Sequence, residues 1–366
     1  MSKFKVIQLL PELNIGGVER GTKDFSKVLV ERGHDSLVIS NGGIFEKDII
    51  EDGGKHINLP IHKKSLFSIR YASDLRDIYL SEKPDIVHVR SRMPAWINYF
   101  AYKKLSHKPL LVSTFHGLYS TPLYSQVMSK VDHIIAISKT VKDYIQGTYK
   151  VPNEKITVIP RGCDPEIFNK NPVEETWIKK WYEEFPQTQD KIILTMPTRI
   201  SKWKGVDSFI DLVNLLDDDN YHALIVGPTA KSKKSYLKQL QNKISNYGIE
   251  DKITITGSRN DISNIYKISD FVFNLSIKPE PFGRTTIEAI SSGSKVIGWN
   301  HGGTKEILEE LYPDGLVELD NIEDLAEKVI NLSNMTNSMP KENTFTSERM
   351  TNQTISLYQD LLAKRL

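Results

Sequence analysis

Residues 270–293 read DFVFNLSIKPEPFGRTTIEAISSG, and this stretch predicts a strand, a turn and a helix in that order. Its first part is apolar, as in a buried strand, and two prolines and Gly283 then mark a turn. The first amides of the following helix have no partners within the helix and favour an anion. Glu280 stands before the turn and Glu288 lies inside the helix. The stretch therefore predicts a ligand site beyond the carboxyl end of a parallel strand.

The alternation of strand and helix extends along the whole chain. Short apolar runs predict strands, and amphipathic stretches between them, such as VDSFIDLVNLL, predict helices. This order is typical of βαβ units and a parallel sheet. The runs that predict strands are FKVIQLL, DSLVIS, HINLP, DIVHVRS, LLVSTFHG, HIIAIS and ITVIPRG, followed by KIILTMPTR, YHALIVGP, KITITG, DFVFNLS, KVIGWN and LVEL.

These two series predict an α/β protein of two doubly wound, Rossmann-like domains. Between the series lies the polar stretch NKNPVEETWIKKWYEEFPQTQD, which we expect to be a connector with one short helix. We expect a first domain over 1–170, a second over 171–345, and a final helix over 346–366 that packs back toward the first domain. Ligands bind beyond the carboxyl ends of such strands, so two facing sheets would place a site in the cleft between the domains.

Composition excludes several classes of protein. The 366 residues are 39% hydrophobic and 26% charged, as in a globular protein of two domains. A single cysteine, Cys163, cannot form an internal disulfide, which fits a reducing compartment. The apolar run near the N-terminus stops at Pro11 and is too short for a signal peptide or a membrane span.

Charge is distributed unevenly between the two halves. Residues 1–170 contain 25 Lys and Arg against 18 Asp and Glu, or +7, and the remainder contain 23 against 28, or −5. A basic half favours an anionic partner or surface. Chance variation among solvated side chains is the alternative explanation of the same counts.

A glycine pair follows the first predicted strand, in the sequence NIGGVERGTK at 14–23. Gly16 and Gly17 let the backbone approach a ligand, and the next helix offers its amides to an anion. The dinucleotide fingerprint is absent because these glycines are adjacent. A P-loop is disfavoured because Thr22 and Lys23 stand in reversed order, which turns the lysine about 100° away from the phosphates. A plain tight turn remains the alternative.

Two further strand ends carry polar side chains. His116 ends a strand in TFHG and is expected to face the cleft, whereas His88 lies within a strand pattern and is expected in the core. Arg90 and Arg92 come just after that strand. Two guanidinium groups there suit a carboxylate or a phosphate, and a surface ion pair is the alternative.

Two cations end the first strand of the second domain, Arg199 and Lys204 in PTRISKWKG. Together with the helix amides near 284–286 they could hold a diphosphate and neutralise a leaving phosphate without a metal. Glu288 would then accept hydrogen bonds from a ribose, and Glu280 would reach a sugar at the other end of the diphosphate. Ordinary surface cations and glutamates of a helix cap and a helix face are the alternatives.

The chain resembles glycosyltransferase family 4 over nearly its whole length. The resemblance rests on GGVERG, TFHG, VIPRGCD, TRISKWKG and EPFGRTTIEAISSGSKVIGWNHGG, which occur in the order and domain positions of that family. It implies the GT-B fold, with an acceptor-binding N-terminal domain and a donor-binding C-terminal domain. It also implies a metal-independent enzyme without cofactor that transfers a hexose from a nucleotide-sugar with retention of configuration.

The resemblance implies roles for individual residues. Catalysis is expected to involve His116, beside the transferred sugar, together with Glu280, Arg199 and Lys204. From their position at the end of a strand, and not from the resemblance, Arg90 and Arg92 are expected to hold an anionic acceptor. The expected donor site comprises Gly16, Gly17, Arg199, Lys204, Glu280, Phe282, Gly283, Arg284, Thr285 and Glu288.

Two sequence features bear on these expectations. Three aspartates at 217–219 resemble the Asp-x-Asp pair of metal-dependent glycosyltransferases, but they follow a helix and precede a strand, so we expect a solvated loop and no metal. The loop in IVGPTAKSKKSY is rich in lysine, including Lys231 and Lys234, where many family members have a glycine-rich turn. Because of this departure, the sequence does not predict which residues of this loop face the nucleotide.

Three stretches, GGVERGTKDF, VRSRMPAW and VIPRGCD, are most similar to a branch that builds bacterial lipopolysaccharide cores. We therefore expect a glycan or lipid-linked acceptor and a cytoplasmic protein on the inner face of the inner membrane. Basic and aromatic residues at 62–71 and 99–108 would make that peripheral contact, and no nucleic acid partner is expected. A nucleotide-sugar 2-epimerase of the same fold and a non-catalytic nucleotide-sugar binding protein remain alternatives.

Overall fold

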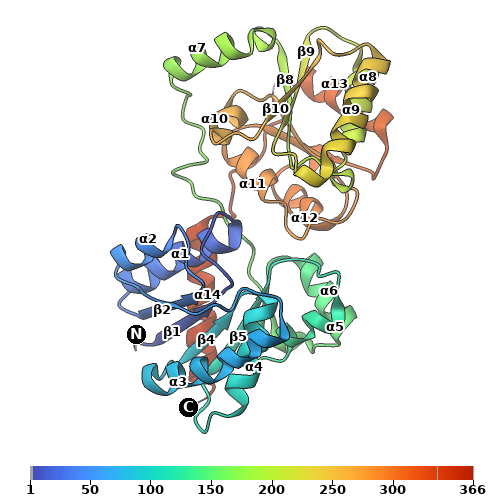
Figure 1. The fold of residues 1–366 in the computed structure, drawn as a ribbon. Helices are drawn as coiled ribbons and strands as arrows, with labels where there is room; N and C mark the ends of the chain where they lie inside the picture. Colours follow the sequence, from blue (N-terminus) through green and yellow to red (C-terminus); the bar gives the residue numbers. More distant parts are fainter. Residues whose placement is uncertain (1–2, 336, 366) are drawn as a thin grey trace. The chain divides into compact units, whose positions relative to one another are not determined.

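A computed structural model describes residues 3–335 and 337–365, and its contacts divide the chain into two compact units. The first unit is Met1–Pro160 with Glu348–Leu366, and the second is Arg161–Ser347 (Figure 1). This division comes earlier in the chain than the expected boundary at 170. The segment after Pro160 packs into the second unit, where Phe168 lies against the ring of Tyr266 at 6.2 Å.

The first unit contains a sheet of seven parallel strands in the order β3-β2-β1-β4-β5-β6-β7. Each apolar run that predicted a strand in this part of the chain forms one. The strands are β1 (Lys5–Leu9), β2 (Asp35–Ser40), β3 (Lys55–Asn58), β4 (Ile86–Val89), β5 (Leu110–Phe115), β6 (His133–Ala136) and β7 (Ile156–Val158). The helices are α1 (Gly17–Glu31), α2 (Glu46–Glu51), α3 (Ala72–Glu82), α4 (Arg92–Lys103), α5 (Pro122–Ser125), α6 (Lys139–Tyr149) and α14 (Ser347–Ala363).

The final helix α14 supplies part of the core of the first unit, beside its strands (Figure 1). Its residues Ile355 and Tyr358 lie in one apolar cluster with side chains of β1, α1, β4 and β5. The Tyr358 hydroxyl hydrogen-bonds Nδ1 of His88 at 2.6 Å, and Nε2 of His88 bonds the Thr114 hydroxyl at 2.6 Å. Burial, and secondarily the charge of Arg90, lower the pKa of His88 well below its usual value, so His88 is a neutral core residue.

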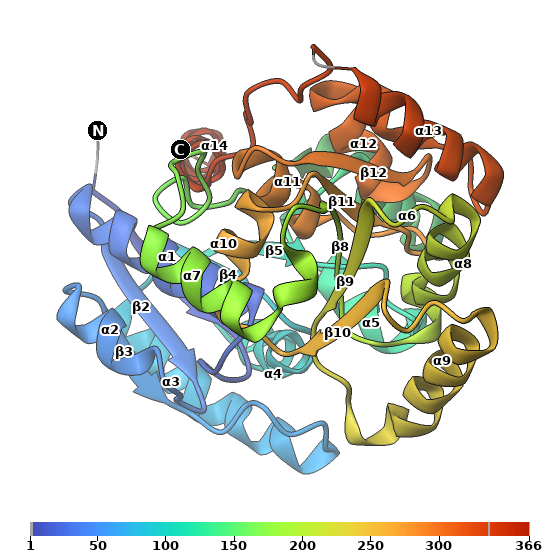
Figure 2. The same ribbon diagram turned by 90° about the horizontal axis from the view of Figure 1, so that it is seen from above.

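The second unit contains a sheet of six parallel strands in the order β10-β9-β8-β11-β12-β13. The six predicted strands are all present. They are β8 (Ile192–Pro197), β9 (Tyr221–Val226), β10 (Ile253–Gly257), β11 (Phe271–Asn274), β12 (Lys295–Trp299) and β13 (Leu316–Val317). The helices are α7 (Glu175–Glu184), α8 (Val206–Leu216), α9 (Lys234–Tyr247), α10 (Ile262–Lys267), α11 (Arg284–Ser291), α12 (Gly302–Leu311) and α13 (Ile322–Asn334). Helices α8 and α9 lie side by side (Figure 2).

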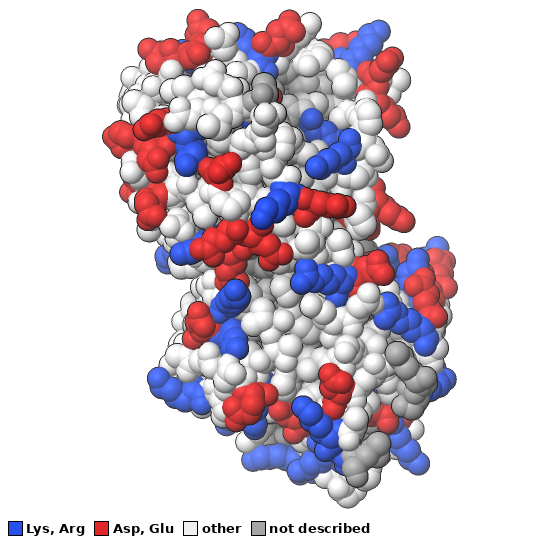
Figure 3. Space-filling view, turned by 180° about the vertical axis from the view of Figure 1, so that it is seen from behind, with Lys and Arg blue, Asp and Glu red and all other residues white. Residues whose placement is uncertain are grey.

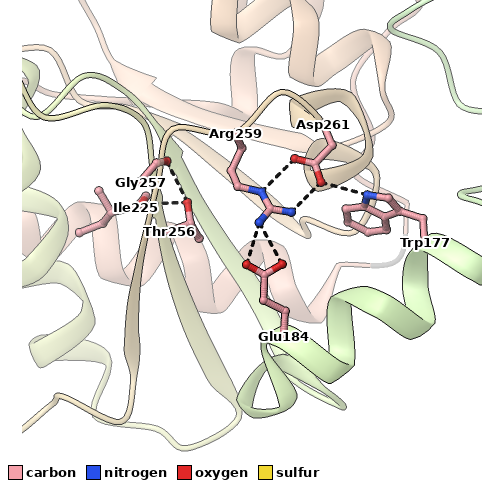
Figure 4. A network of polar contacts seen from close by, with 7 residues as sticks. All are labelled: Trp177, Glu184, Ile225, Thr256, Gly257, Arg259 and Asp261. Carbon is pink, nitrogen blue, oxygen red and sulfur yellow. Dashed lines mark hydrogen bonds and ion pairs between the residues drawn. The ribbon is translucent and has the colours of Figure 1, made fainter.

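The predicted connector is an integral part of the second unit. Trp181 of α7 is buried in a cluster with side chains of β8, β9 and α10. Arg259, just after β10, binds both carboxylate oxygens of Glu184 at 2.9 and 3.0 Å and also pairs with Asp261 (Figure 4). Burial acts to raise the pKa of Asp261, but bonds from Arg259 and Trp177 outweigh it and hold the pKa below its usual value. This fork fastens α7 to the carboxyl end of β10.

The strand order of each sheet reverses once. In the first unit β1 pairs with both β2 and β4, and in the second β8 pairs with both β9 and β11. In doubly wound sheets, ligands bind outside the carboxyl ends of the strands at such a switch point. The segments that follow β1, β4, β8 and β11 contain every candidate residue except His116, which follows β5.

Candidate active site

Lys204 and Glu280, from two loops of the second unit, form an ion pair. Lys204 ends a short 3-10 helix after β8, and Glu280 lies in the loop after β11. The Glu280 carboxylate also accepts from the Ser276 hydroxyl at 2.6 Å. Glu280 is only 9% exposed, so these two donors compensate a carboxylate that is largely removed from water. Sequence reasoning grouped Lys204 with Glu280 but missed Ser276, because a serine at a strand end has no distinguishing signal.

Helix α11 begins as predicted, and its N-cap Gly283 has φ 97°, a left-handed conformation that favours glycine. Glu288 is 7% exposed and accepts from Arg284 at 2.8 Å and from the Tyr266 hydroxyl at 3.4 Å. Burial, followed by the charge of Glu288, raises the pKa of Tyr266 well above its usual value, so this hydroxyl remains a donor. Glu288 is therefore held in place from two sides.

The remaining donor-site candidates of the second unit differ in exposure. Arg199 is exposed and makes no ion pair with any described residue. Thr285 is half-buried, at the start of α11. Phe282 was expected to contact the donor, but its ring is 5% exposed and packs edge-on against Phe345 at 5.9 Å. Its side chain therefore belongs to the core, and only its backbone could face a ligand.

In the first unit, Gly16 and Gly17 begin α1 as expected from the sequence. The Glu19 carboxylate lies close to Gly16, where an added Cβ would come within 2.0 Å of Glu19 Oε2. His116 follows β5 and is half-buried, and its backbone N–H donates to the Tyr119 hydroxyl at 3.3 Å. Tyr119 in turn accepts, through its carbonyl, from the Tyr144 hydroxyl at 2.7 Å. Tyrosines thus support the loop that carries His116.

Arg90 and Arg92 have different partners and do not form a single two-guanidinium site. Arg92 lies over the rings of Tyr119 and Tyr124 at 4.8 and 5.4 Å and donates to Thr121 at 3.1 Å. Arg90 is 8% exposed, lies over Phe25 at 5.6 Å, and no described acidic residue pairs with it. Burial lowers the pKa of Arg90 to about 10. The surface ion pair that the sequence left open is absent at both arginines among the described residues.

Acidic clusters in the described part of the chain do not assemble a metal site. No group of three or more His, Cys, Asp or Glu residues there has the geometry to hold a metal ion. Of the three aspartates at 217–219, Asp217 and Asp219 pair with Lys252 at 3.3 and 3.0 Å. Their side chains are 85% and 88% exposed, as expected of a solvated loop.

Comparison with known proteins identifies both units. Residues 15–167 match the model of Glycosyltransferase Family 4, and residues 178–348 match that of Glycosyl transferases group 1. A glycosyltransferase from Rickettsia africae is 30% identical, with 99% of each chain covered and a TM-score of 0.86. HepE from Anabaena, in complex with UDP and glucose, shares the fold at 20% identity and a TM-score of 0.78, over 98% of this chain and 100% of that one.

An enzyme of known name is also similar in sequence along nearly its whole length. N-acetyl-alpha-D-glucosaminyl L-malate synthase of Bacillus anthracis is 24% identical over 375 residues, which is 95% of either chain. Similarity to known glycosyltransferases therefore extends along both units.

Proposed function

The chain belongs to the family 4 and group 1 glycosyltransferases of GT-B fold, which are retaining enzymes with nucleotide-sugar donors. From this premise we propose that it transfers a hexose to an anionic glycan or glycolipid without a metal or cofactor. The observation that carries the proposal is the Lys204–Glu280 ion pair beside the N-terminus of α11. A diphosphate at those amides would meet a cation, and its sugar would meet a carboxylate.

We assign the donor to the second unit. Arg199 and Lys204 bind the diphosphate with the amides of Gly283, Arg284 and Thr285. Glu280 binds the sugar and Glu288 the ribose. On the family resemblance alone, we propose that Gly16, Gly17 and His116 of the first unit also take part in donor binding.

We assign the acceptor's anionic group to the first unit, at Arg90 and Arg92. The buried Arg90 guanidinium supports this assignment, because no described carboxylate compensates it. Arg92 already stacks on two tyrosines, and its contribution is the weaker of the two. The sequence similarity of VRSRMPAW favours an acceptor of the lipopolysaccharide-core type.

A thermal-shift screen across UDP, GDP and ADP sugars, followed by an assay for donor hydrolysis and transfer, tests the function. A bound donor raises the melting temperature because it stabilises the folded state. Transfer with retention in the presence of EDTA is expected. Epimerised donor without transfer would identify the 2-epimerase, and binding without turnover would identify a non-catalytic binding protein.

The two glutamates should have separable effects. Glu288→Ala is expected to raise the Kd of the free nucleoside diphosphate about tenfold, because a charge-assisted hydrogen bond to the ribose is lost. Glu280→Ala should leave diphosphate binding within about twofold of wild type and raise the KM of the intact donor about tenfold. Calorimetry of the diphosphate and initial rates with the donor measure both. Equal losses of diphosphate affinity in the two variants would contradict the assignment of the two ends.

We further propose that the first unit docks on the cytoplasmic face of the inner membrane through a basic–aromatic surface, defined as Phe67, Tyr99, Phe100, Lys103 and Lys130. Phe67 is 84% exposed, and its short helix packs beside α4. Lys103 and Lys130 lie over the Tyr99 ring at 4.7 and 5.2 Å. No helix among the described residues is long and apolar enough to span a bilayer. Basic and acidic side chains are interspersed on the face in Figure 3, so net charge alone does not select a docking surface there.

Liposome co-sedimentation tests this surface. Binding should require anionic lipid and weaken as salt rises. Lys103→Ala with Lys130→Ala is expected to weaken it about thirtyfold, since each lysine near an anionic surface contributes about 1 kcal/mol. Lys231→Ala with Lys233→Ala, in the second unit, is the matched control. Equal binding to neutral liposomes, or an equal loss in the control, would refute the proposal.

A further inference from the structure

The Glu280 carboxylate is held through only one of its oxygens. Lys204 Nζ and Ser276 Oγ both donate to Oε1. No described residue donates a hydrogen bond to Oε2. A carboxylate oxygen can accept about two hydrogen bonds, so Oε1 is saturated and Oε2 retains its capacity.

Ser276 is itself fixed by the loops on either side of it. It is 3% exposed and follows β11. Nε2 of His301, in the loop after β12, donates to its carbonyl at 2.7 Å. The next amide, that of Ile277, donates to the carbonyl of Trp203 at 2.8 Å, in the loop after β8. Residues 276 and 277 therefore connect the loops of three neighbouring strands, including the loop that carries Lys204.

The other end of this turn is fastened as well. The Gly303 amide donates to the Glu280 carbonyl at 2.8 Å. With His301 on Ser276 and Gly303 on Glu280, the N-cap and first turn of α12 hold both ends of the turn 276–280. The backbone of Glu280 is thus positioned by the first turn of α12, while the rotation of its carboxylate depends on Lys204 and Ser276.

From this geometry we propose that Ser276 is a positioning residue for the donor sugar. Its hydroxyl fixes Oε1 of Glu280, so that only Oε2 accepts hydrogen bonds from the sugar hydroxyls. The inference rests on the proposed function and deepens it, because it places sugar discrimination at one oxygen atom. Without the serine hydroxyl, Lys204 alone orients the carboxylate, which then rotates and offers either oxygen to the sugar.

The test uses the full-length protein with the donor found in the screen. Ser276→Ala should raise the KM of the intact donor about tenfold, because a hydrogen bond to a charged group is lost, and should change the Kd of the free nucleoside diphosphate by less than about twofold. The preference between two donors that differ only in the orientation of one hydroxyl should also fall. A matched control is Ser269→Ala, which removes a buried hydroxyl before the same strand, where it donates to the Ile265 carbonyl. That variant should change neither donor KM nor sugar preference.

Two variants with side chains of equal size separate the effect of the hydroxyl from the effect of packing. Ser276→Thr retains the hydroxyl and Ser276→Val lacks it, so the donor KM of Ser276→Thr should be lower than that of Ser276→Val and closer to the wild-type value. Equal donor KM in these two, or parallel losses of donor and diphosphate affinity in Ser276→Ala, would overturn the inference. A wild-type protein that turns over no nucleotide-sugar would instead refute the proposed function, whereas normal turnover with an unchanged donor KM in Ser276→Ala would refute only the role of Ser276.

Discussion

Lys204→Ala is expected to lower kcat for sugar transfer about a hundredfold, because the departing diphosphate then lacks a fixed cation in the transition state. Arg199→Ala should have an effect of similar size, since it would remove the second cation of the same site. Steady-state rates at saturating donor measure both. Lys202→Ala is the control, because Lys202 lies in the same 3-10 helix, is exposed and packs over the Tyr236 ring. Near-normal turnover in both Lys204→Ala and Arg199→Ala would remove the diphosphate assignment.

The same substitution should also lower thermal stability, and that effect must be separated from catalysis. Lys204→Ala leaves the Glu280 carboxylate, which is 9% exposed, without its cation. Adding Glu280→Gln to Lys204→Ala removes the uncompensated charge, so the melting temperature should recover while turnover stays low. Recovery of turnover together with stability would show that Lys204 acts only through the fold.

Gly205→Ala is expected to destabilise the second unit by about 3 kcal/mol or more. Gly205 has φ 76°, and an added Cβ would lie 1.8 Å from the carbonyl oxygen of Leu275. The left-handed conformation costs a non-glycine residue about 1–2 kcal/mol, and overpacking adds a further 1–3 kcal/mol. Because Leu275 precedes Ser276, displacement of the Leu275 backbone should also disturb the position of Glu280 and weaken donor binding.

Gly248→Ala is the matched control for this prediction. Gly248 has φ 66°, but an added Cβ would meet nothing within 4 Å. It should therefore show the conformational cost alone, about 1–2 kcal/mol. Chemical denaturation and thermal melts of the two variants measure the difference. Equal destabilisation would show that the loop after β8 moves aside and that its close approach to Leu275 is not required.

The strands were accessible from the sequence because buried parallel strands are short apolar runs with few competing interpretations. All thirteen predicted runs form strands, and the glycine turn before α11 is where the sequence placed it. Long-range side-chain partners were not accessible. Nothing in the spacing shows that Ser276 and Lys204 share one oxygen of Glu280, or that Arg90 and Arg92 point to different partners.

Two features of the structure could not be predicted from the sequence, for physical reasons. The stretch with α7 is polar in composition, yet Trp177 and Trp181 stack at 5.2 Å and the Arg259 fork fixes the helix to β10. The mean polarity of the stretch does not show these individual contacts, and it therefore predicted a connector. Phe282 stands between two predicted site residues, and nothing in the spacing shows that its ring is buried against Phe345.

Helix α14 gives the first unit a discontinuous chain, and this sets an order of events during synthesis. A ribosome that has completed residues 1–160 has made every strand of that sheet but not Ile355 or Tyr358, which complete its apolar cluster. The Tyr358 hydroxyl that bonds Nδ1 of His88 is likewise still unsynthesised. The second unit, in contrast, is continuous and is complete before α14 emerges. The core of the first unit is therefore completed only after the whole second unit has been synthesised, so the later-made unit is free to fold first.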